Sequence, residues 1–496
     1  MSRLASIKGA EAVTEGTASR RYLTLIDGEM VESSSGNWLT SIDPATEEVL
    51  GQVPACNPAD VDRAVAAAAR AQPAWADVSI AERAALLREV GRQLMAQRDV
   101  IVDIEVRDSG NTISRMAHDL TLGVDMIDYY AGIANEVKGE TLPGSRRGLH
   151  MVLRDPYGVV GRIVPFNHPI YFGITAIAGP LMAGNAVLLK PSEQSPLSAS
   201  YLGEVCAKVL PRGLVNILSG SGEVGAAIVR HPGVPRIAFT GSVPTGLAIQ
   251  RTAAESCVKH VSLELGGKNP IIVFPDMDVE AAADAAVAGM NFAWQGQSCG
   301  STSRLMVHES IYDAVVDAVA DRVKRLHPGD PRDPSAQVGP INSRGHFERV
   351  CSYVRMGIED GARLVAGGKR PTGPQFERGF WIEPTVFADV TMDMRIAREE
   401  IFGPVLSILR WRDAEDAVAV ANATQFGLTA SIWTQDVGAA LAMARRVRAG
   451  TVAVNCNILH YPGSPFGGVG NSGTGREECL DELLSYTQTK AIHVAL

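Results

Sequence analysis

The stretch VVGRIVPFNHPIYFGITAIAGPLMAGNAVLLKPSE, residues 159–193, decides the fold class. Its apolar run at 159–164 predicts a short buried strand, and the run at 186–189 predicts a second. Residues 170–189 carry no charge, so they must be weighed as a membrane span. The glycines and Pro180 inside this segment instead favour a buried helix followed by a strand. A strand–helix–strand unit of this kind is the building block of a parallel sheet.

The same alternation extends on both sides of this unit. Before it, a hairpin is expected across Asp27-Gly28-Glu29, and a helix is expected to start after Ser79 with Glu82 completing a capping box. Further apolar strands are expected at 215–218, 237–239, 261–263 and 271–273. After Cys299 a second series is expected, with strands at 304–307, 405–410, 431–433 and 451–454 and helices at 311–326, 347–360, 414–423 and 437–447. Two α/β domains are therefore expected to meet near residues 265–300.

Composition narrows the class of protein. A chain of 496 residues is too long for one compact core. The net charge of −9 argues against a nucleic-acid partner. Seven cysteines without a C-x-x-C pair indicate reduced thiols rather than disulfides or a metal centre. The absence of an apolar run in Met1–Ala10 argues against a secretory signal, so a cytoplasmic location is expected.

One cysteine and one carboxylate have the surroundings of a catalytic pair. Cys299 lies in the run Gly-Gln-Ser-Cys-Gly, and Glu264 opens the run Glu-Leu-Gly-Gly-Lys. A thiol flanked by small residues can attack a carbonyl, and a carboxylate beside a Gly-Gly turn can activate water. A lone cysteine is more often a buried structural thiol. The remaining motifs are needed to choose between these readings.

Two glycine-rich turns could each hold a dinucleotide phosphate. Gly220-Ser-Gly222-Glu-Val-Gly225 follows an expected strand and opens an expected helix. Phe239-Thr-Gly241-Ser242-Val-Pro-Thr-Gly246 has the same layout one unit later. Either could equally be an ordinary turn between a strand and a helix. Spacing alone does not choose between them.

Polar residues follow two of the expected strands. Lys190 and Glu193 come directly after the strand at 186–189, where an ammonium and a carboxylate can bind ribose hydroxyls. Asn167 lies between Pro165 and Pro169 and could donate to a developing oxyanion. A solvated loop in the first case and simple turn chemistry in the second are the alternative readings.

Seven motifs occur in a fixed order, and together they identify a family. They are Pro165–Pro169, Lys190–Glu193, Phe239–Ser242, Glu264–Lys268, Gly296–Cys299, Glu400–Pro404 and Pro465–Gly468. In this order they resemble the aldehyde dehydrogenase superfamily from about Tyr22 to the C-terminus. The resemblance implies an α/β fold with a Rossmann-type NAD-binding domain at 1–137 and 158–265 and a catalytic domain at 266–478. It also implies a small β oligomerisation element at 138–157 and 479–496.

The resemblance implies which residues bind the cofactor. The pyrophosphate is expected at Gly241, Ser242 and Gly246, with Gly222 nearer the adenine. Lys190 and Glu193 are expected at the adenosine ribose, and Glu400 and Phe402 at the nicotinamide end. Val164 and Leu265 complete the expected set of cofactor residues. A carboxylate at Glu193 repels a 2′-phosphate, so NAD is expected in preference to NADP.

The resemblance also implies a hydrolytic mechanism without a metal. Cys299 is expected to attack the aldehyde, Asn167 and the Cys299 N–H to hold the oxyanion, and Glu264 to activate the water that releases the acid. Two positions depart from the family pattern. Phe166 replaces the usual Trp, and Ala176 replaces a lysine that many members pair with the glutamate matching Glu477. Glu477 is therefore a catalytic candidate whose usual partner is missing, so water or backbone carbonyls are expected to substitute.

The expected aldehyde tunnel is aromatic and apolar. The positions that match its lining are Leu122, His168, Tyr171, Phe172, Thr175, Phe466 and the loop 457–464, which includes His460. With no Lys or Arg among them, a carboxylate-bearing semialdehyde would lack a cationic partner. An apolar or aromatic aldehyde is therefore the expected substrate, and an amino or betaine-type aldehyde is the alternative.

Three other activities share part of this pattern. A CoA-acylating dehydrogenase usually lacks a carboxylate at position 264. A thiol hydrolase without a cofactor would leave Lys190–Glu193 and Gly241–Gly246 unexplained, and a structural relative would more often have lost Cys299. The segments 141–157 and 485–496 match regions that pair between subunits, so a homodimer or homotetramer is expected.

Overall fold

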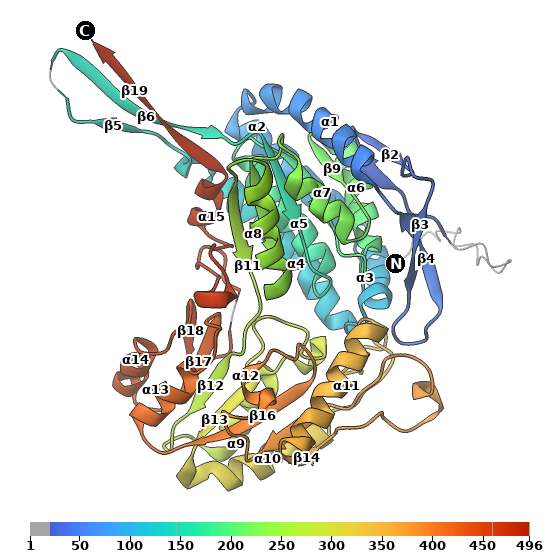
Figure 1. Cartoon of the computed structure of the whole chain (residues 1–496), viewed down its shortest axis with the longest axis vertical. Helices are drawn as coiled ribbons and strands as arrows, with labels where there is room; N and C mark the ends of the chain where they lie inside the picture. The colour runs from blue at the N-terminus through green and yellow to red at the C-terminus, as the bar shows by residue number, and fades with distance from the viewer. Residues whose placement is uncertain (1–19, 145, 459, 496) are drawn as a thin grey trace, which may run out of the picture.

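The structure is a computed structural model that describes residues 20–144, 146–458 and 460–495. The first 19 residues of the predicted NAD-binding domain therefore lie outside the described residues. Two seven-stranded sheets form the body of the molecule, and a three-stranded sheet projects from it as an arm. The upper and lower halves of the body in Figure 1 each contain one of the large sheets.

The first large sheet contains the strand–helix–strand unit with which the fold was predicted. Its strand order is β11 (His260–Glu264), β10 (Arg236–Thr240), β7 (Val159–Ile163), β8 (Ala186–Lys190), β9 (Val215–Ile217), β1 (Thr24–Ile26), β2 (Glu29–Val31). Neighbours from β11 to β9 are parallel, and the predicted hairpin β1–β2 adds two antiparallel strands. Every residue of β7 and β8 is buried, as expected for parallel strands covered on both faces.

Helices surround this sheet. They are α1 (Pro58–Ala76), α2 (Ile80–Ala96), α3 (Arg98–Ser109), α4 (Ile113–Ile133), α5 (Pro169–Met182), α6 (Leu197–Val209), α7 (Gly222–Arg230) and α8 (Val243–Ser256). The predicted capping box is present at the start of α2, where Ser79 and Glu82 bond to each other's backbone N–H groups. All of α5 is buried, so the uncharged segment is a core helix followed by β8. Within the described part of the chain, no helix has both the length and the apolarity needed to cross a membrane.

The second large sheet corrects one prediction. Its order is β14 (Arg363–Ala366), β15 (Thr385–Ala388), β16 (Val405–Trp411), β13 (Arg304–His308), β12 (Pro270–Val273), β17 (Thr429–Trp433), β18 (Thr451–Val454). The strand expected at 271–273 had been listed with the first series of strands, although the domain boundary implied by the resemblance, after residue 265, separates it from them. In the structure β12 pairs with β13 and β17 of the second sheet. The chain changes sheets between Glu264 and Pro270. Apolar sequence predicts that a strand is buried and does not identify its partner strands.

The remaining elements complete the body and the arm. The helices of the second half are α9 (Val279–Gly289), α10 (Tyr312–Lys324), α11 (Arg344–Glu359), α12 (Arg395–Arg398), α13 (Ala414–Asn422), α14 (Val437–Ala444) and α15 (Leu480–Ser485). Short 3-10 turns are η1 (Ala134–Glu136), η2 (Phe292–Trp294), η3 (Glu309–Ile311), η4 (Pro374–Phe376) and η5 (Gly470–Ser472). A separate hairpin joins β3 (Trp38–Ile42) and β4 (Val49–Pro54). The arm consists of β5 (Glu140–Leu142), β6 (Gly148–Pro156) and β19 (Thr487–Ala495), with β6 in the middle and antiparallel to both.

Candidate active site

The chain crosses between the two large sheets beside Cys299. Glu264 is the last residue of β11 in the first sheet, and β12 of the second sheet starts six residues later. Asn269, in this crossing, donates from Nδ2 to the carbonyls of Cys299 (2.6 Å) and Ser301 (2.9 Å). The crossing segment therefore begins at Glu264 and, through the Asn269 side chain, is hydrogen-bonded to the backbone of the loop that contains Cys299.

A sharp bend positions Cys299. Gln295 and Gly296 both have left-handed backbone, with φ of 53° and 66°. A Cβ at Gly296 would lie 2.3 Å from the Gly403 carbonyl oxygen, so only glycine fits there. Burial, followed by the charges of Glu400 and Glu264, raises the pKa of the Cys299 thiol to about 12. The thiol is therefore protonated at neutral pH, and attack on a carbonyl requires a group that takes its proton.

Glu264 is a buried carboxyl group with no hydrogen-bond partner among the described residues. Its residue is 5% exposed, and both carboxylate oxygens are buried and unpartnered. A Cβ at Gly467 would lie 2.7 Å from Glu264 Oε1, so the glycine leaves space for the carboxyl group. Burial and then the charge of Glu477 raise the pKa of Glu264 well above its usual value. A buried, unpartnered carboxyl group with a raised pKa is typical of a proton-transfer site.

Asn167 lies on the loop between β7 and α5, and two side chains hold that loop. Asn111 donates from Nδ2 to the Asn167 carbonyl (2.9 Å), and Glu105 accepts the Ile170 N–H (3.1 Å) at the start of α5. The Asn167 Oδ1 atom is buried and has no hydrogen-bond partner within residues 20–144, 146–458 and 460–495. Neither Asn111 nor Glu105 was predicted to support the site. The only signal for them in the sequence is that they are polar residues within and just after a stretch rich in Val and Ile.

Glu477 has a cationic partner that the sequence analysis missed. Both terminal nitrogens of Arg162, a buried residue of β7, lie 3.1 Å from Glu477 Oε1. Ala176 is fully buried. Arg162 supplies a positive charge beside Glu477, whereas the expectation that water or backbone carbonyls take over the proton relay of the absent lysine stays a prediction. A guanidinium keeps its proton at all ordinary pH values, so Arg162 pairs with Glu477 and does not relay protons. The available signal was an arginine within the apolar strand 159–164, since buried arginines are almost always paired.

Several predicted cofactor residues lie at the carboxyl ends of strands in the first sheet. Lys190 ends β8, and its Nζ lies 2.7 Å from Glu193 Oε2. Ser242 follows β10 and caps α8 by accepting the Thr245 N–H. A Cβ at Gly241 would lie 2.4 Å from the Phe239 ring, whereas a Cβ at Gly222 would meet no atom within 4 Å. Gly222, the first residue of α7, therefore borders open space.

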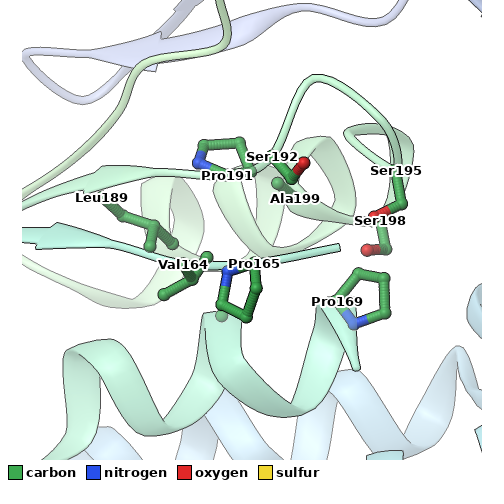
Figure 2. Close-up of a pocket in the computed structure, with 10 residues that line it drawn as sticks. Val164, Pro165, Pro169, Leu189, Pro191, Ser192, Ser195, Ser198 and Ala199 are labelled. Carbon is green, nitrogen blue, oxygen red and sulfur yellow. The ribbon is translucent and has the colours of Figure 1, made fainter. Parts of the chain in front are cut away.

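Three further predicted cofactor residues, Val164, Leu265 and Gly246, are held in place by backbone hydrogen bonds or by packing. Val164 donates its N–H to the Lys190 carbonyl (3.1 Å), and Leu265 donates to the Ser472 carbonyl (2.8 Å). Gly246 packs against Leu265, since a Cβ there would lie 2.8 Å from that side chain. Figure 2 shows Val164 with Pro165, Pro169, Leu189 and Pro191 around a small cavity. The volume of this cavity is about 10 Å³, enough for about one water molecule. Cys299 is not among its lining residues.

Glu400 contacts the same Gly-Gly turn that follows Glu264. Its Oε1 accepts the Gly267 N–H (2.9 Å), and a Cβ at Gly266 would lie 1.9 Å from Oε2. Burial raises the pKa of Glu400 to about 7. Two residues later, Phe402 has left-handed backbone with φ of 59°, and its carbonyl accepts a hydrogen bond from His346 Nε2 at 2.6 Å. A bulky residue in this conformation is strained, which is common where a ligand is held.

Aromatic rings from distant parts of the chain gather at the predicted aldehyde lining. The His168 ring lies 5.7 Å from Phe172 and 5.4 Å from Trp294, a contact that the sequence analysis missed. Tyr171 lies 6.3 Å from His460, and His460 lies 4.7 Å from Phe466. Of the other two predicted positions, Leu122 is partly buried, and the buried Thr175 hydroxyl donates to the Phe172 carbonyl (3.4 Å).

Charged groups reach this lining from outside the predicted positions. Asp119 Oδ2 lies 2.7 Å from His168 Nδ1, and Glu478 Oε1 accepts the Tyr171 hydroxyl at 2.6 Å. Arg115, an exposed residue of α4, lies over the Trp294 ring at 4.6 Å. The lining is therefore aromatic with two built-in carboxylates, rather than aromatic and apolar throughout.

Comparison with known proteins gives consistent matches. A family model described as the aldehyde dehydrogenase family matches residues 30–492. Aldehyde dehydrogenase tropH of Talaromyces stipitatus is 42% identical over 476 residues, covering 93% of this chain and 92% of that protein. A solved NAD-dependent aldehyde dehydrogenase from Sinorhizobium meliloti has a TM-score of 0.93 at 40% identity, covering 96% of this chain and 95% of that one. P. syringae AldA, an indole-3-acetaldehyde dehydrogenase solved with NAD⁺ and IAA, has a TM-score of 0.93 at 37% identity, covering 96% of each chain.

Proposed function

The chain belongs to the aldehyde dehydrogenase family, and we propose that it oxidises aromatic or apolar aldehydes to carboxylic acids with NAD. Cys299 is the proposed nucleophile and Glu264 the proposed base that releases the acid. The observation that carries the hydrolytic assignment is Glu264 itself, a buried carboxyl group with both oxygens unpartnered among the described residues. A CoA-acylating enzyme does not need a base that activates water. Burying an unpartnered carboxyl group destabilises the fold, so a protein with only a structural role would be expected to lose it.

The predicted cofactor residues fit an NAD molecule. The close approach of Glu400 to Gly266 requires glycine there, and Gly222 leaves open space at the start of α7. Lys190 and Glu193 would bind the adenosine ribose, Ser242 the pyrophosphate and Glu400 the nicotinamide ribose. NAD supplies the oxidising power of the reaction when it is bound. We assign the cofactor domain to residues 1–137 and 158–265, and the catalytic domain to residues 266–478.

The first chemical step is attack of the Cys299 sulfur on the aldehyde carbon. Because burial and nearby carboxylates keep the Cys299 thiol protonated, the proton must leave as the carbon–sulfur bond forms. Water takes this proton, and Glu264, whose oxygens are unpartnered among the described residues, is assigned to the later hydrolysis. The Asn167 amide, on a loop fixed by Asn111 and Glu105, would donate to the developing oxyanion.

The second step is hydrolysis of the thioester that oxidation leaves on Cys299. Glu264 would take a proton from water as the water attacks the thioester carbonyl. Burial and then the charge of Glu477, which is paired with Arg162, raise the pKa of Glu264 and so make it a stronger base once it is deprotonated. We propose that Glu477 and Arg162 act through Glu264 and do not contact the substrate.

The aromatic lining supports the choice of substrate. Rings of Phe172, Trp294 and Phe466 offer apolar surface, whereas the carboxylates of Asp119 and Glu478 would repel a substrate carboxylate. An amino or betaine-type aldehyde stays as the second candidate, because aromatic faces and carboxylates also suit a cation. Both carboxylates already accept hydrogen bonds from this lining, which favours the uncharged substrate.

A comparison of aldehydes tests this proposal. We expect benzaldehyde and octanal to give kcat/KM values at least roughly tenfold higher than succinic semialdehyde, since burial of an apolar group contributes about 1–3 kcal/mol. The measurement is NADH absorbance at 340 nm with NAD⁺ at equal subsaturating aldehyde concentrations, with NADP⁺ and CoA in parallel reactions. Faster turnover of the semialdehyde, or of betaine aldehyde, would show that the pocket has been assigned the wrong substrate class.

The arm supports a proposal about assembly. Leu142, Leu149, Leu153 and Val494 on its three strands are 38–40% exposed. The outer strands β5 and β19 also present unpaired edges. We propose that residues 138–157 and 479–496 form the contact between subunits of a homodimer or homotetramer.

Charges on the arm should disrupt this assembly. We expect the double variant Leu149→Glu and Leu153→Glu to sediment as a smaller species than the wild type. In the proposed assembly both leucines are covered by the neighbouring subunit, so the variant would bury two charges at the interface. Analytical ultracentrifugation measures the change, and the exposed pair Val437→Glu and Leu441→Glu on α14 is the matched control. A monomeric wild type, or an unchanged assembly in the arm variant, would contradict the proposal.

A further inference from the structure

Glu478 is an unusual residue beside the predicted aldehyde lining. Its side chain is buried, and its backbone is left-handed with φ of 64°, a conformation that few residues other than glycine adopt. Its N–H donates to Glu482 Oε2 (2.7 Å), and its carbonyl accepts the Gly463 N–H (2.8 Å). The backbone is therefore held at both ends, and the carboxylate has a fixed position.

One oxygen of Glu478 accepts two hydrogen bonds from the lining. The Tyr171 hydroxyl lies 2.6 Å from Oε1, and His460 Nδ1 lies 2.7 Å from the same atom. A carboxylate at Nδ1 fixes the tautomer, so the Nδ1 atom of His460 carries a proton that it donates. The remaining polar atom of the ring is Nε2. The His460 side chain is 34% exposed, and its ring lies beside Phe466 and Tyr171.

We propose that Nε2 of His460, positioned by Glu478, is a specificity-determining subsite that donates a hydrogen bond to an uncharged oxygen substituent of an aromatic aldehyde. This inference rests on the proposed oxidation of aromatic aldehydes and names the substituent that the same pocket selects. The rings of Tyr171 and Phe466 would flank the aromatic part of such a substrate. A methoxy, hydroxyl or ring carbonyl oxygen provides the acceptor.

The charges around His460 favour an uncharged oxygen over a carboxylate. Glu478 balances the positive charge of a protonated His460 at 2.7 Å. Asp119 and Glu477 also act on the ring, and both are acidic. A substrate carboxylate would therefore meet a net negative environment, whereas a neutral acceptor needs only the Nε2–H donor.

The protonation of His460 makes this selectivity depend on pH. Burial disfavours the charged imidazolium, but the charges of Glu478, Asp119 and Glu477 outweigh it and raise the pKa of His460 above its usual value. The Tyr171 hydroxyl, which also donates to Glu478, has a pKa raised well above its usual value by burial, so it stays neutral. Below the raised pKa of His460, Nε2 carries a proton and donates; above it, Nε2 has only a lone pair.

A matched pair of substrates isolates this hydrogen bond. 4-Methoxybenzaldehyde and 4-ethylbenzaldehyde differ by one oxygen in place of a methylene group, and the 3-substituted pair covers the other ring position. We expect the methoxy compound of one pair to have a kcat/KM about tenfold higher, the usual size of a hydrogen bond to a charged group. The ratio should fall toward one as the pH rises through the pKa of His460. Titration of Cys299 and Glu264 affects both substrates equally and cancels in the ratio.

Variants separate His460 from the rest of the lining. His460→Phe keeps a ring beside Phe466 and should reduce the ratio to about one, because only the methoxy compound loses a hydrogen bond. Glu478→Gln removes the charge that raises the pKa of His460, so the loss of selectivity should occur at lower pH than in the wild type. His168→Gln keeps a donor for Asp119 and should leave the ratio unchanged.

The outcomes distinguish this inference from the proposed function. A wild-type ratio near one in both pairs, a ratio that survives His460→Phe, or a ratio lost in His168→Gln would overturn the subsite. In each of those cases turnover of 4-ethylbenzaldehyde would still support oxidation of aromatic aldehydes. Absence of turnover with every benzaldehyde would instead overturn the proposed substrate class, and the subsite with it.

Discussion

Cys299→Ala is expected to abolish aldehyde oxidation while leaving NAD binding intact. Without the sulfur, the aldehyde carbon never becomes tetrahedral, so oxidation has no reactive intermediate from which to start. We expect a loss on the order of 10⁴-fold or more in kcat, as is usual when a covalent nucleophile is removed. NADH production at 340 nm measures the rate, and titration of NAD against intrinsic fluorescence measures binding.

The matched control for this substitution is Cys456→Ala. Cys456 is also partly buried, and its backbone carbonyl, rather than its thiol, accepts the Ser431 hydroxyl. Its removal should leave kcat within about twofold of the wild type, as for a substitution without a named role. Residual activity above a trace in Cys299→Ala, or equal losses in both variants, would be incompatible with Cys299 as the nucleophile.

Glu264→Gln is expected to produce one burst of NADH followed by slow turnover. The amide keeps the shape of the side chain but takes no proton, so the thioester forms and then accumulates. Loss of a general base typically lowers the rate by about 10²–10⁴-fold. Rapid-mixing absorbance at 340 nm resolves the burst, whose amplitude should approach one NADH per active site.

The pH dependence provides a second readout of Glu264. Burial and Glu477 raise its pKa well above the usual value, and only the deprotonated form accepts a proton from water. Hydrolysis in the wild type should therefore accelerate as the pH rises through this raised pKa. In Glu264→Gln the hydrolysis rate should not show this increase with pH. An unchanged steady-state rate without a burst in the variant would assign the base to another residue.

Local sequence was enough to predict much of the fold. The predictions of the buried strands β7 and β8 and of α5 between them are confirmed. They could be made because a short apolar strand and a longer apolar helix that contains glycine and proline have distinct sequence patterns. The helix α3 was not predicted. Its residues Val100, Ile101, Val102, Ile104 and Val106 are β-branched and disfavour helix formation by themselves. Packing against α4 and α6 overrides that preference.

The missed parts of the site are pairings between distant residues. Arg162 and Glu477 are 315 positions apart, and Tyr171 and Glu478 are 307 apart. No local pattern predicts which carboxylate meets which cation across such separations. The assignment of β12 to the second sheet is a similar case, because strand pairing is a property of the folded chain. The predicted roles of Cys299, Glu264, Asn167 and the cofactor residues stay predictions that experiments on the variants will test.

The most direct test of the proposed chemistry is the intact mass of Glu264→Gln after mixing with NAD⁺ and benzaldehyde. The proposed mechanism predicts a protein heavier by one benzoyl group, with peptide mapping locating it on Cys299, and no such adduct when Cys299→Ala is added to the variant. A protein of unchanged mass after the NADH burst, or a benzoyl group on any other residue, would contradict covalent catalysis by Cys299.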